Sequence, residues 1–89
     1  MVTLFSREEK RMPHISIKML KGRSEAQKAA AAEAVKKAVM TSLGAGDAYV
    51  SVSIEDFTPE EWQDVFKAEI TDKPEALRIP PKYTPKELL

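Results

Sequence analysis

Two residues near the start of the chain have side chains suited to proton transfer and anion binding. Met12 is followed by Pro13, and a chain that begins at Met12 would lose this methionine and expose Pro13 as its first residue. The free secondary amine of such a proline titrates near about 8, or lower when it is buried beside cations, so it can act as a base near neutral pH. In a chain that begins at Met1, the same nitrogen is an ordinary amide without this chemistry.

Arg23 is the second candidate, at the start of a predicted helix. Its planar guanidinium can hold a carboxylate through two hydrogen bonds and polarise a neighbouring carbonyl group. A cation at the start of a helix opposes the helix dipole, which favours a functional role over a solvated charge. His14 is expected to be a hydrogen-bonded strand residue, with a smaller chance of lining a pocket. Lys18 and Lys21 are expected to be solvated, although either could depress the pKa of the amine.

A strand and a long helix must position these residues. Alternation predicts a strand over residues 14–20, with one face formed by Ile15, Ile17 and Met19. Ser24 and Gln27 form a capping box that begins a helix over residues 25–43. Alanine is frequent in this helix, so it can lie close against a sheet, and we expect it to present Val35, Val39 and Leu43. Gly44 or Gly46 is expected to end the helix in the left-handed conformation.

A second strand and a second helix follow. Residues 48–55 alternate again, which predicts a strand parallel to the first and joined to it by a right-handed crossover. Thr58, Pro59 and Glu61 are a strong helix start, and the helix is expected over residues 59–70. Its apolar side chains recur at helical spacing: Trp62, Val65, Phe66 and Ile70. Prolines exclude a long helix from residues 71–89.

These elements predict an α+β fold, a β-α-β protomer with a second short helix, in one domain over residues 12–89. Residues 1–11 are either an extension, whose apolar residues 2–5 could add an edge strand, or the product of a start assigned too early. A two-stranded sheet leaves both edges and one face open. We therefore expect the strands of two or more copies to join into a larger sheet.

Composition excludes several classes of function. Lys and Arg together number 14 and so do Asp and Glu, without a basic block, so nucleic acid is not an expected partner. The absence of cysteine and the presence of a single histidine exclude disulfides, thiolate catalysis and a histidine-rich metal site in one chain. No apolar run approaches the roughly 20 residues that span a bilayer, and the first residues do not resemble a signal peptide. The expected compartment is the cytoplasm.

The motifs resemble the 4-oxalocrotonate tautomerase family. The resemblance rests on Met12-Pro13, on Gly22-Arg23-Ser24-Glu25 followed by Gln27-Lys28, and on the β-α-β order. The stretches 49–54, 59–63 and 68–70 are closer to the small dimeric bacterial tautomerases that act on phenylpyruvate-type enols. The resemblance covers residues 12 to about 83.

The resemblance implies a catalytic amino-terminal proline, supplied here by Pro13, and a substrate-binding arginine, supplied by Arg23. It implies an aromatic wall formed by Trp62, with Phe66 or Phe57 as substitutes. The second arginine of the family would fall at Ser51, and this departure favours a substrate with one carboxylate over a dicarboxylate. No metal or organic cofactor is implied, and a homodimer is expected rather than a hexamer.

Two functions from different classes follow. The first is a cofactor-independent keto–enol tautomerase of 2-oxo acids carrying one carboxylate, with Pro13 as base. The alternative is a non-catalytic oligomeric module of the same fold, in which residues 1–11 block Pro13. Hydratase or dehalogenase chemistry would need a protonated proline and further polar partners, which the sequence does not identify.

Overall fold

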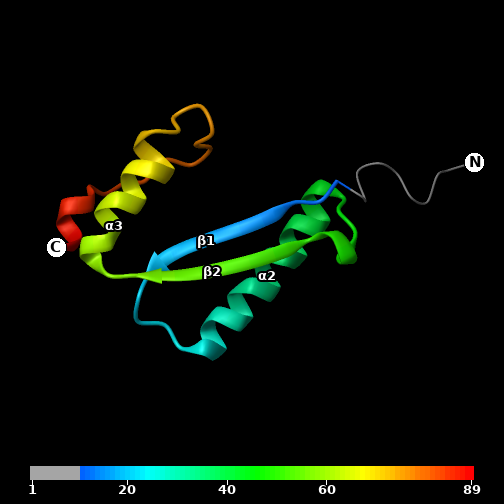
Figure 1. Cartoon of the computed structure of the whole chain (residues 1–89). Helices are drawn as coiled ribbons and strands as arrows, with labels where there is room; N and C mark the ends of the chain where they lie inside the picture. The colour runs from blue at the N-terminus through cyan, green and yellow to red at the C-terminus, as the bar shows by residue number, and fades with distance from the viewer. Residues whose placement is uncertain (1–10) are drawn as a thin grey trace, which may run out of the picture. The chain divides into compact units, whose positions relative to one another are not determined.

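The computed structural model describes residues 11–89 and gives an α+β chain (Figure 1). Strand β1 (His14–Leu20) leads into helix α2 (Glu25–Leu43), the 3-10 helix η1 (Asp47–Tyr49) and strand β2 (Ser51–Phe57). Helix α3 (Pro59–Phe66) continues into the π-helical segment η2 (Lys67–Thr71), and the 3-10 helix η3 (Pro85–Leu88) lies near the end. The predicted β-α-β order with a second short helix is confirmed. The expected edge strand near residues 2–5 lies outside the described residues.

The described residues form two compact units, and both strands contribute to each unit. The first unit contains the described residues through Ile17 and residues 22–55, and the second contains residues 18–21 and 56–89. The first unit therefore holds α2 with one end of each strand. The second unit holds α3 and the C-terminal segment with the other end of each strand.

Strands β1 and β2 are hydrogen-bonded neighbours and run parallel. The Ser51 N–H donates to the carbonyl of Pro13 (3.3 Å), and the Lys21 N–H donates to the carbonyl of Phe57 (2.9 Å). Residue numbers therefore increase in the same direction along both strands. The prediction that β2 begins near residue 48 is wrong. The chain forms η1 there, and the Tyr49 N–H bonds back to the carbonyl of Gly46 (2.9 Å), which leaves it unavailable to the sheet.

Local signals fix both ends of α2. Ser24 accepts a hydrogen bond from the Gln27 N–H (3.1 Å) and Gln27 accepts one from the Ser24 N–H (2.9 Å), which confirms the predicted capping box. Gly44 ends the helix with a φ of 71°, in the left-handed region that glycine tolerates best. Its N–H donates to the carbonyl of Met40 (3.0 Å).

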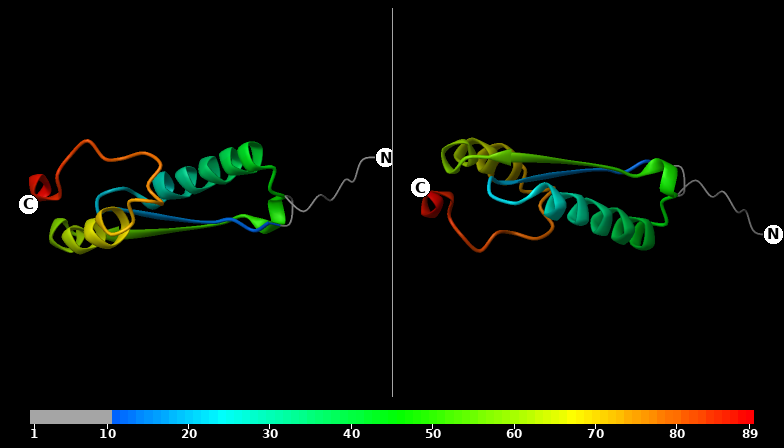
Figure 2. Two further views of the ribbon diagram at one scale, coloured as in Figure 1. Left: turned by 90° about the horizontal axis from the view of Figure 1, so that it is seen from above. Right: turned by 90° about the horizontal axis from the view of Figure 1, so that it is seen from below.

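In the first unit, α2 runs along one face of the strand segments (Figure 2). Val35 and Val39 are half-buried on the helix, but Leu43 is 58% exposed, so the prediction that it faces the sheet is wrong. Successive residues of a helix are rotated by about 100°, so Leu43 lies about 80° around the helix from Val35. In the last turn of α2, the apolar positions no longer face the strands.

The core of a single chain is small. Ala45 and Val50 are the buried apolar residues of the described part, at 5% and 7% exposure, and the apolar side chains of both strands are only half-buried. An isolated two-stranded sheet is marginal in water. No helix in the described part is long and apolar enough to cross a membrane. The apolar surface that one chain leaves exposed therefore favours association with another protein surface.

In the second unit, α3 begins with the predicted capping box. The Thr58 N–H donates to Glu61 Oε1 (2.8 Å), and the Glu61 N–H donates to Thr58 Oγ1 (3.1 Å). Regular α-helix ends at Phe66, earlier than predicted, because the next turn widens into η2. The side-chain amide of Gln63 donates to the carbonyls of Pro59 (3.1 Å) and Pro85 (2.8 Å), which ties the C-terminal segment to α3.

The capping box of α3 should make the stability of the protein depend on pH in the acidic range. The hydrogen bond from the Thr58 backbone N–H lowers the pKa of Glu61 below its ordinary value of 4.5. Desolvation opposes this shift, and the Thr58 side chain and Lys21 add smaller lowering effects. The carboxylate therefore stabilises the fold above about pH 4.5, and this contribution is lost as the pH falls through the lowered pKa. Glu61→Gln should show a smaller loss of melting temperature between pH 7 and pH 3 than the wild type. The exposed neighbour provides the control Glu60→Gln, which should retain the wild-type acid dependence; equal curves for all three proteins would contradict the prediction.

Candidate functional site

Pro13 lies at the beginning of β1, beside a hollow of about 420 Å³ lined by Arg11, Met12, Pro13 and Leu43. Leu43 is the last residue of α2. Met12 is 73% exposed and is the residue bonded to the proline nitrogen. Pro13 itself is half-buried and has an apolar side chain next to it.

The nitrogen of Pro13 carries no proton in the 89-residue chain, because a peptide bond joins it to Met12 and delocalises its lone pair. The carbonyl of Pro13 accepts the hydrogen bond from the Ser51 N–H, so the residue is held by the sheet. A chain that begins at Pro13 would keep this attachment and would have a free secondary amine in the same place. The chemistry of Pro13 thus depends on the N-terminus, whereas its position depends on β2.

His14 is bound on both ring nitrogens by side chains of β2. Its Nδ1 lies 2.7 Å from Ser51 Oγ, and its Nε2 lies 3.2 Å from Ser53 Oγ. Since side chains alternate across a strand, these three residues share the face opposite Ile15 and the buried Val50. The prediction of a hydrogen-bonded His14 is confirmed, but its partners were not predicted. They could have been predicted by aligning the two strands in parallel and pairing the residues that point away from the helix-covered face.

Arg23 lies in the turn between β1 and α2, directly after Gly22, whose φ of 136° only glycine adopts readily. The arginine is exposed. The two ends of β1 lie roughly 20 Å apart, at about 3.3 Å per residue. Pro13 precedes one end and Arg23 follows the other, a distance that an arginine side chain cannot bridge. A single chain therefore does not bring the two candidates together.

Trp62 and Phe66 lie in the second unit, where both contact Tyr83. Trp62 Nε1 donates to Tyr83 Oη (2.9 Å), and the rings of Phe66 and Tyr83 meet edge to face with centroids 5.6 Å apart. Phe57 packs against Trp62 at 6.2 Å in the same manner. The structure thus gives these aromatic side chains a definite role, the attachment of the C-terminal segment. The aromatic wall of a substrate site stays a prediction.

The role of Tyr83 is not predicted by its local sequence. Its only signal is a tyrosine among prolines in a segment without periodicity, which does not indicate the partner of an aromatic ring far earlier in the chain. In the structure its hydroxyl accepts from Trp62 and its ring packs on Phe66. Such long-range pairs are not visible in local patterns.

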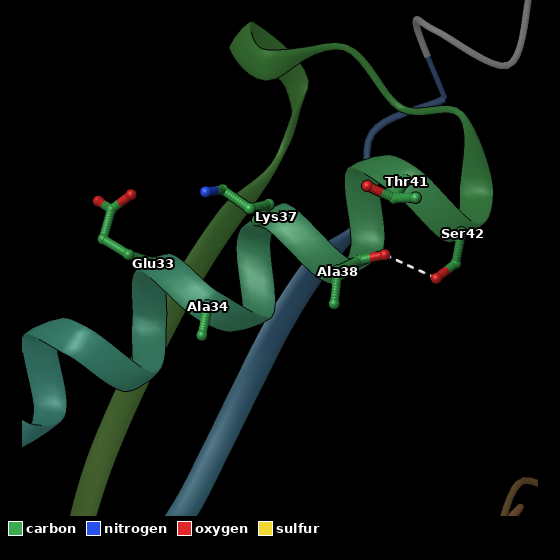
Figure 3. A pocket seen from close by; sticks show the side chains of 6 residues that line it. All are labelled: Glu33, Ala34, Lys37, Ala38, Thr41 and Ser42. Carbon is green, nitrogen blue, oxygen red and sulfur yellow. Dashed lines mark hydrogen bonds between the residues drawn. The ribbon is translucent and has the colours of Figure 1, made fainter.

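A second hollow, of about 540 Å³, lies along α2 and is lined by Glu33, Ala34, Lys37, Ala38, Thr41 and Ser42 (Figure 3). The hydroxyl of Ser42 donates to the carbonyl of Ala38 (2.6 Å) and so is engaged within the helix. Ala34 and Ala38 have small exposed side chains, which allow another helix to approach closely. This surface is suited to helix packing rather than to chemistry.

The described part of the chain contains no group of three or more His, Asp or Glu side chains placed to hold a metal ion. The pKa of Lys67 is raised, chiefly by its hydrogen bond to Asp72, but this pair lies in the second unit at the end of α3. A polar cluster formed by His14, Ser51 and Ser53 lies next to Pro13 along the strands, and it is joined to Pro13 through the Ser51 N–H.

Comparison with known proteins gives consistent matches. The profile of a family described as tautomerase enzyme matches residues 13–64. Tautomerase PptA of Escherichia coli O127:H6 is 38% identical over 74 residues, which is 82% of this chain and 99% of that protein. PptA of Escherichia coli strain K12 / DH10B is 36% identical over 74 residues, 82% of this chain and 96% of that protein. The crystal structure of TomN, a 4-oxalocrotonate tautomerase homologue in the tomaymycin biosynthetic pathway, superposes with a TM-score of 0.54 and 38% identity over 56% of this chain and 77% of its own.

The contact between Trp62 and Tyr83 should hold the C-terminal segment in place. Tyr83→Phe removes the acceptor and Trp62→Phe removes the donor, and each should destabilise the protein by about 1 kcal/mol through this bond. The loss of unfolding free energy in the double variant should then be smaller than the sum of the losses in the two single variants, because the hydrogen bond can be lost only once. Chemical unfolding measures the energies, and limited trypsin digestion after Arg78 and Lys82 reports release of the segment. Strictly additive effects would show that the two side chains are not coupled.

Proposed function

The chain belongs to the tautomerase family, and we propose that it is a cofactor-independent keto–enol tautomerase of 2-oxo acids carrying one carboxylate. Pro13 is its base when the chain begins at that residue. The observation that carries this proposal is the position of Pro13, which the Ser51 N–H holds at a strand end beside a hollow. Pro13 is also the first residue of the family match.

The reaction needs one neutral amine. The Pro13 nitrogen takes the proton from the 2-hydroxyl of the enol and returns it to carbon 3, which gives the keto form without net loss or gain of protons. Leu43 lines the same hollow and gives the nitrogen an apolar neighbour, and removal of the amine from water would favour its neutral form. Arg23 binds the carboxylate of the substrate. Ser51, where the family has a second arginine, leaves the site with one fewer cation, which supports a substrate with one carboxylate.

The distance along β1 supports a site shared between two copies. Pro13 and Arg23 of one chain lie beyond opposite ends of the strand, but antiparallel pairing of β1 with β1 of a second copy places the start of each strand beside the end of the other. Each Pro13 would then lie near the partner's Arg23. Both edges of the two-stranded sheet are unpaired within the described chain, and the small residues of α2 offer a matching helix surface. We therefore infer a homodimer with two sites.

A second candidate is a non-catalytic oligomeric module. It is favoured by the observation that Arg11 and Met12 themselves line the hollow beside Pro13, so in a chain that retains them these two residues lie next to the proline nitrogen. The intact mass of the protein from its own host separates the two candidates. A measured mass equal to that of a chain beginning at Pro13 supports the enzyme. A measured mass that includes residues 2–11 supports the non-catalytic module.

Activity should depend on the free amine of Pro13. In a chain expressed from Met12, Pro13→Ala should lower kcat/KM for enol ketonisation by about 100-fold or more, because a primary amine is a poorer fit in both basicity and shape. The full chain from Met1 provides the control and should be similarly inactive, since its nitrogen is an amide. Absorbance of a phenylpyruvate-type enol follows the reaction. Undiminished ketonisation by Pro13→Ala would exclude this base.

Complementation tests whether the site is shared. Pro13→Ala and Arg23→Ala should each be nearly inactive alone, whereas unfolding and refolding them together in equal amounts should restore about a quarter of wild-type activity, because half of the dimers are mixed and each has one intact site. Refolding either variant with itself is the control. A mixture no more active than its components would place both residues of each site in one chain.

A further inference from the structure

An exposed histidine is held in one orientation at the start of β1. Both ring nitrogens of His14 contact hydroxyls of β2, with Nδ1 at 2.7 Å from Ser51 and Nε2 at 3.2 Å from Ser53. Most exposed side chains exchange rotamers freely, but two contacts from a neighbouring strand fix this ring. The proton positions of the cluster are then restricted as well, because each contact needs one donor and one acceptor.

A neutral imidazole has one N–H and one acceptor nitrogen, so it can donate to only one of the two serines. If Nδ1 carries the proton, it donates to Ser51 Oγ, and the Ser53 hydroxyl donates to Nε2. The hydroxyl proton of Ser51 is then not used within the cluster. If Nε2 carries the proton, the Ser51 hydroxyl is consumed by Nδ1 and the free proton belongs to Ser53.

Ser51 is the member of the cluster that lies beside Pro13. Its backbone N–H bonds to the carbonyl of Pro13, so the two residues are direct neighbours across the strands. Ser53 lies two residues further along β2, about 7 Å away from that point. A free hydroxyl proton on Ser51 is therefore available at the same strand end as the nitrogen of Pro13, whereas one on Ser53 is not.

We propose that the Ser51 hydroxyl donates a hydrogen bond to the 2-oxygen of the substrate, and that His14 and Ser53 are positioning residues that keep this proton pointing outward. This inference rests on the proposed tautomerase function and extends it. The order of donation is Ser53 to His14 Nε2, His14 Nδ1 to Ser51, and Ser51 to the oxygen. Hydrogen bonds in such a chain polarise one another, which strengthens the last donor.

The donor acts where charge develops. As Pro13 removes the proton from the enol hydroxyl, the 2-oxygen gains negative charge before carbon 3 is protonated, and a fixed O–H lowers the energy of that state. No proton leaves Ser51, so the balance of the reaction is unchanged. The face opposite α2 would thus supply the donor for the oxygen, and the strand end would supply the base.

The contacts of His14 would also serve a purely structural purpose, because cross-strand side-chain pairs stabilise sheets. The two roles differ in what they affect. A structural role changes the melting temperature and leaves the relative binding of two ligands unaltered. A donor to the 2-oxygen changes the preference for a ligand that has this oxygen over one that lacks it.

Nitrogen NMR tests the proton order directly in the full chain. His14 is the single histidine, so labelling histidine with 15N gives the two ring signals of this residue alone. At a pH where the ring is neutral, we expect the Nδ1–H tautomer in the wild type and a shift toward Nε2–H in Ser53→Ala. A dominant Nε2–H tautomer in the wild type would overturn the proposed order.

Paired inhibitors test the role of Ser51 in the chain that begins at Pro13. The probes are phenylpyruvate and 3-phenylpropanoate, which differ in the 2-oxygen. We expect the wild type to bind the first about tenfold more tightly, and Ser51→Ala to bring this ratio close to one, with kcat for ketonisation reduced about 10- to 100-fold. Ser51→Thr keeps a hydroxyl and should restore the ratio.

Two controls separate the possible failures. Arg23→Ala should weaken both inhibitors, because both carry the carboxylate that Arg23 is proposed to bind. Thr71→Ala, which removes an exposed hydroxyl of η2, should leave the ratio and kcat unchanged. An active wild type whose ratio survives in Ser51→Ala overturns this inference and leaves the tautomerase proposal standing. A wild type beginning at Pro13 without activity overturns the proposed function itself. Melting temperatures of all variants show whether each is folded.

Discussion

The pairing of β1 with β2 is the constraint on which the rest of the structure depends. Its backbone hydrogen bonds extend from the carbonyl of Pro13 to the N–H of Lys21, so they hold the candidate base at one end of the sheet and lead to the turn with Arg23 at the other. The same register places His14 opposite two serines. A shift of one residue would turn the imidazole toward α2 and separate the base from its polar neighbours.

That pairing is not sufficient to complete a core. With Ala45 and Val50 as the buried apolar residues of the described part, hydrophobic stabilisation within one chain is small. Among residues 11–89, neither edge of the sheet has a further neighbouring strand. Association and catalysis therefore have a common physical origin in our proposal. The open edge that requires a second copy is also the edge where the second copy brings its arginine.

In the second unit, the aromatic side chains that the family resemblance assigns to a substrate site have a structural role. Trp62 and Phe66 are engaged by Tyr83, and Gln63 binds the carbonyl of Pro85, so α3 secures a proline-rich segment that has little regular structure of its own. An aromatic side chain that holds such a segment is still able to present its other face to a ligand. The two roles are compatible, and only the first is visible in one chain.

The sequence by itself determined the features that depend on near neighbours. The capping boxes of α2 and α3, a left-handed helix end at Gly44 or Gly46 and the α+β order follow from short-range hydrogen bonding and periodicity. The structure confirms them and assigns the helix end to Gly44. The family and its candidate residues Pro13 and Arg23 were also recognisable, because a motif is a local pattern. The family is confirmed by the comparisons, whereas the roles of the residues are proposals.

Only the tertiary structure decided the features that join distant parts of the chain. The start of β2 was predicted too early because η1 and a true strand share an alternating sequence, and Leu43 was misplaced because a small drift per turn accumulates along a helix. The contact of Trp62 with Tyr83 and the contacts of His14 depend on which strands and segments meet. Register and long-range packing are set by the summed contacts of the whole fold, and no short stretch of sequence contains them.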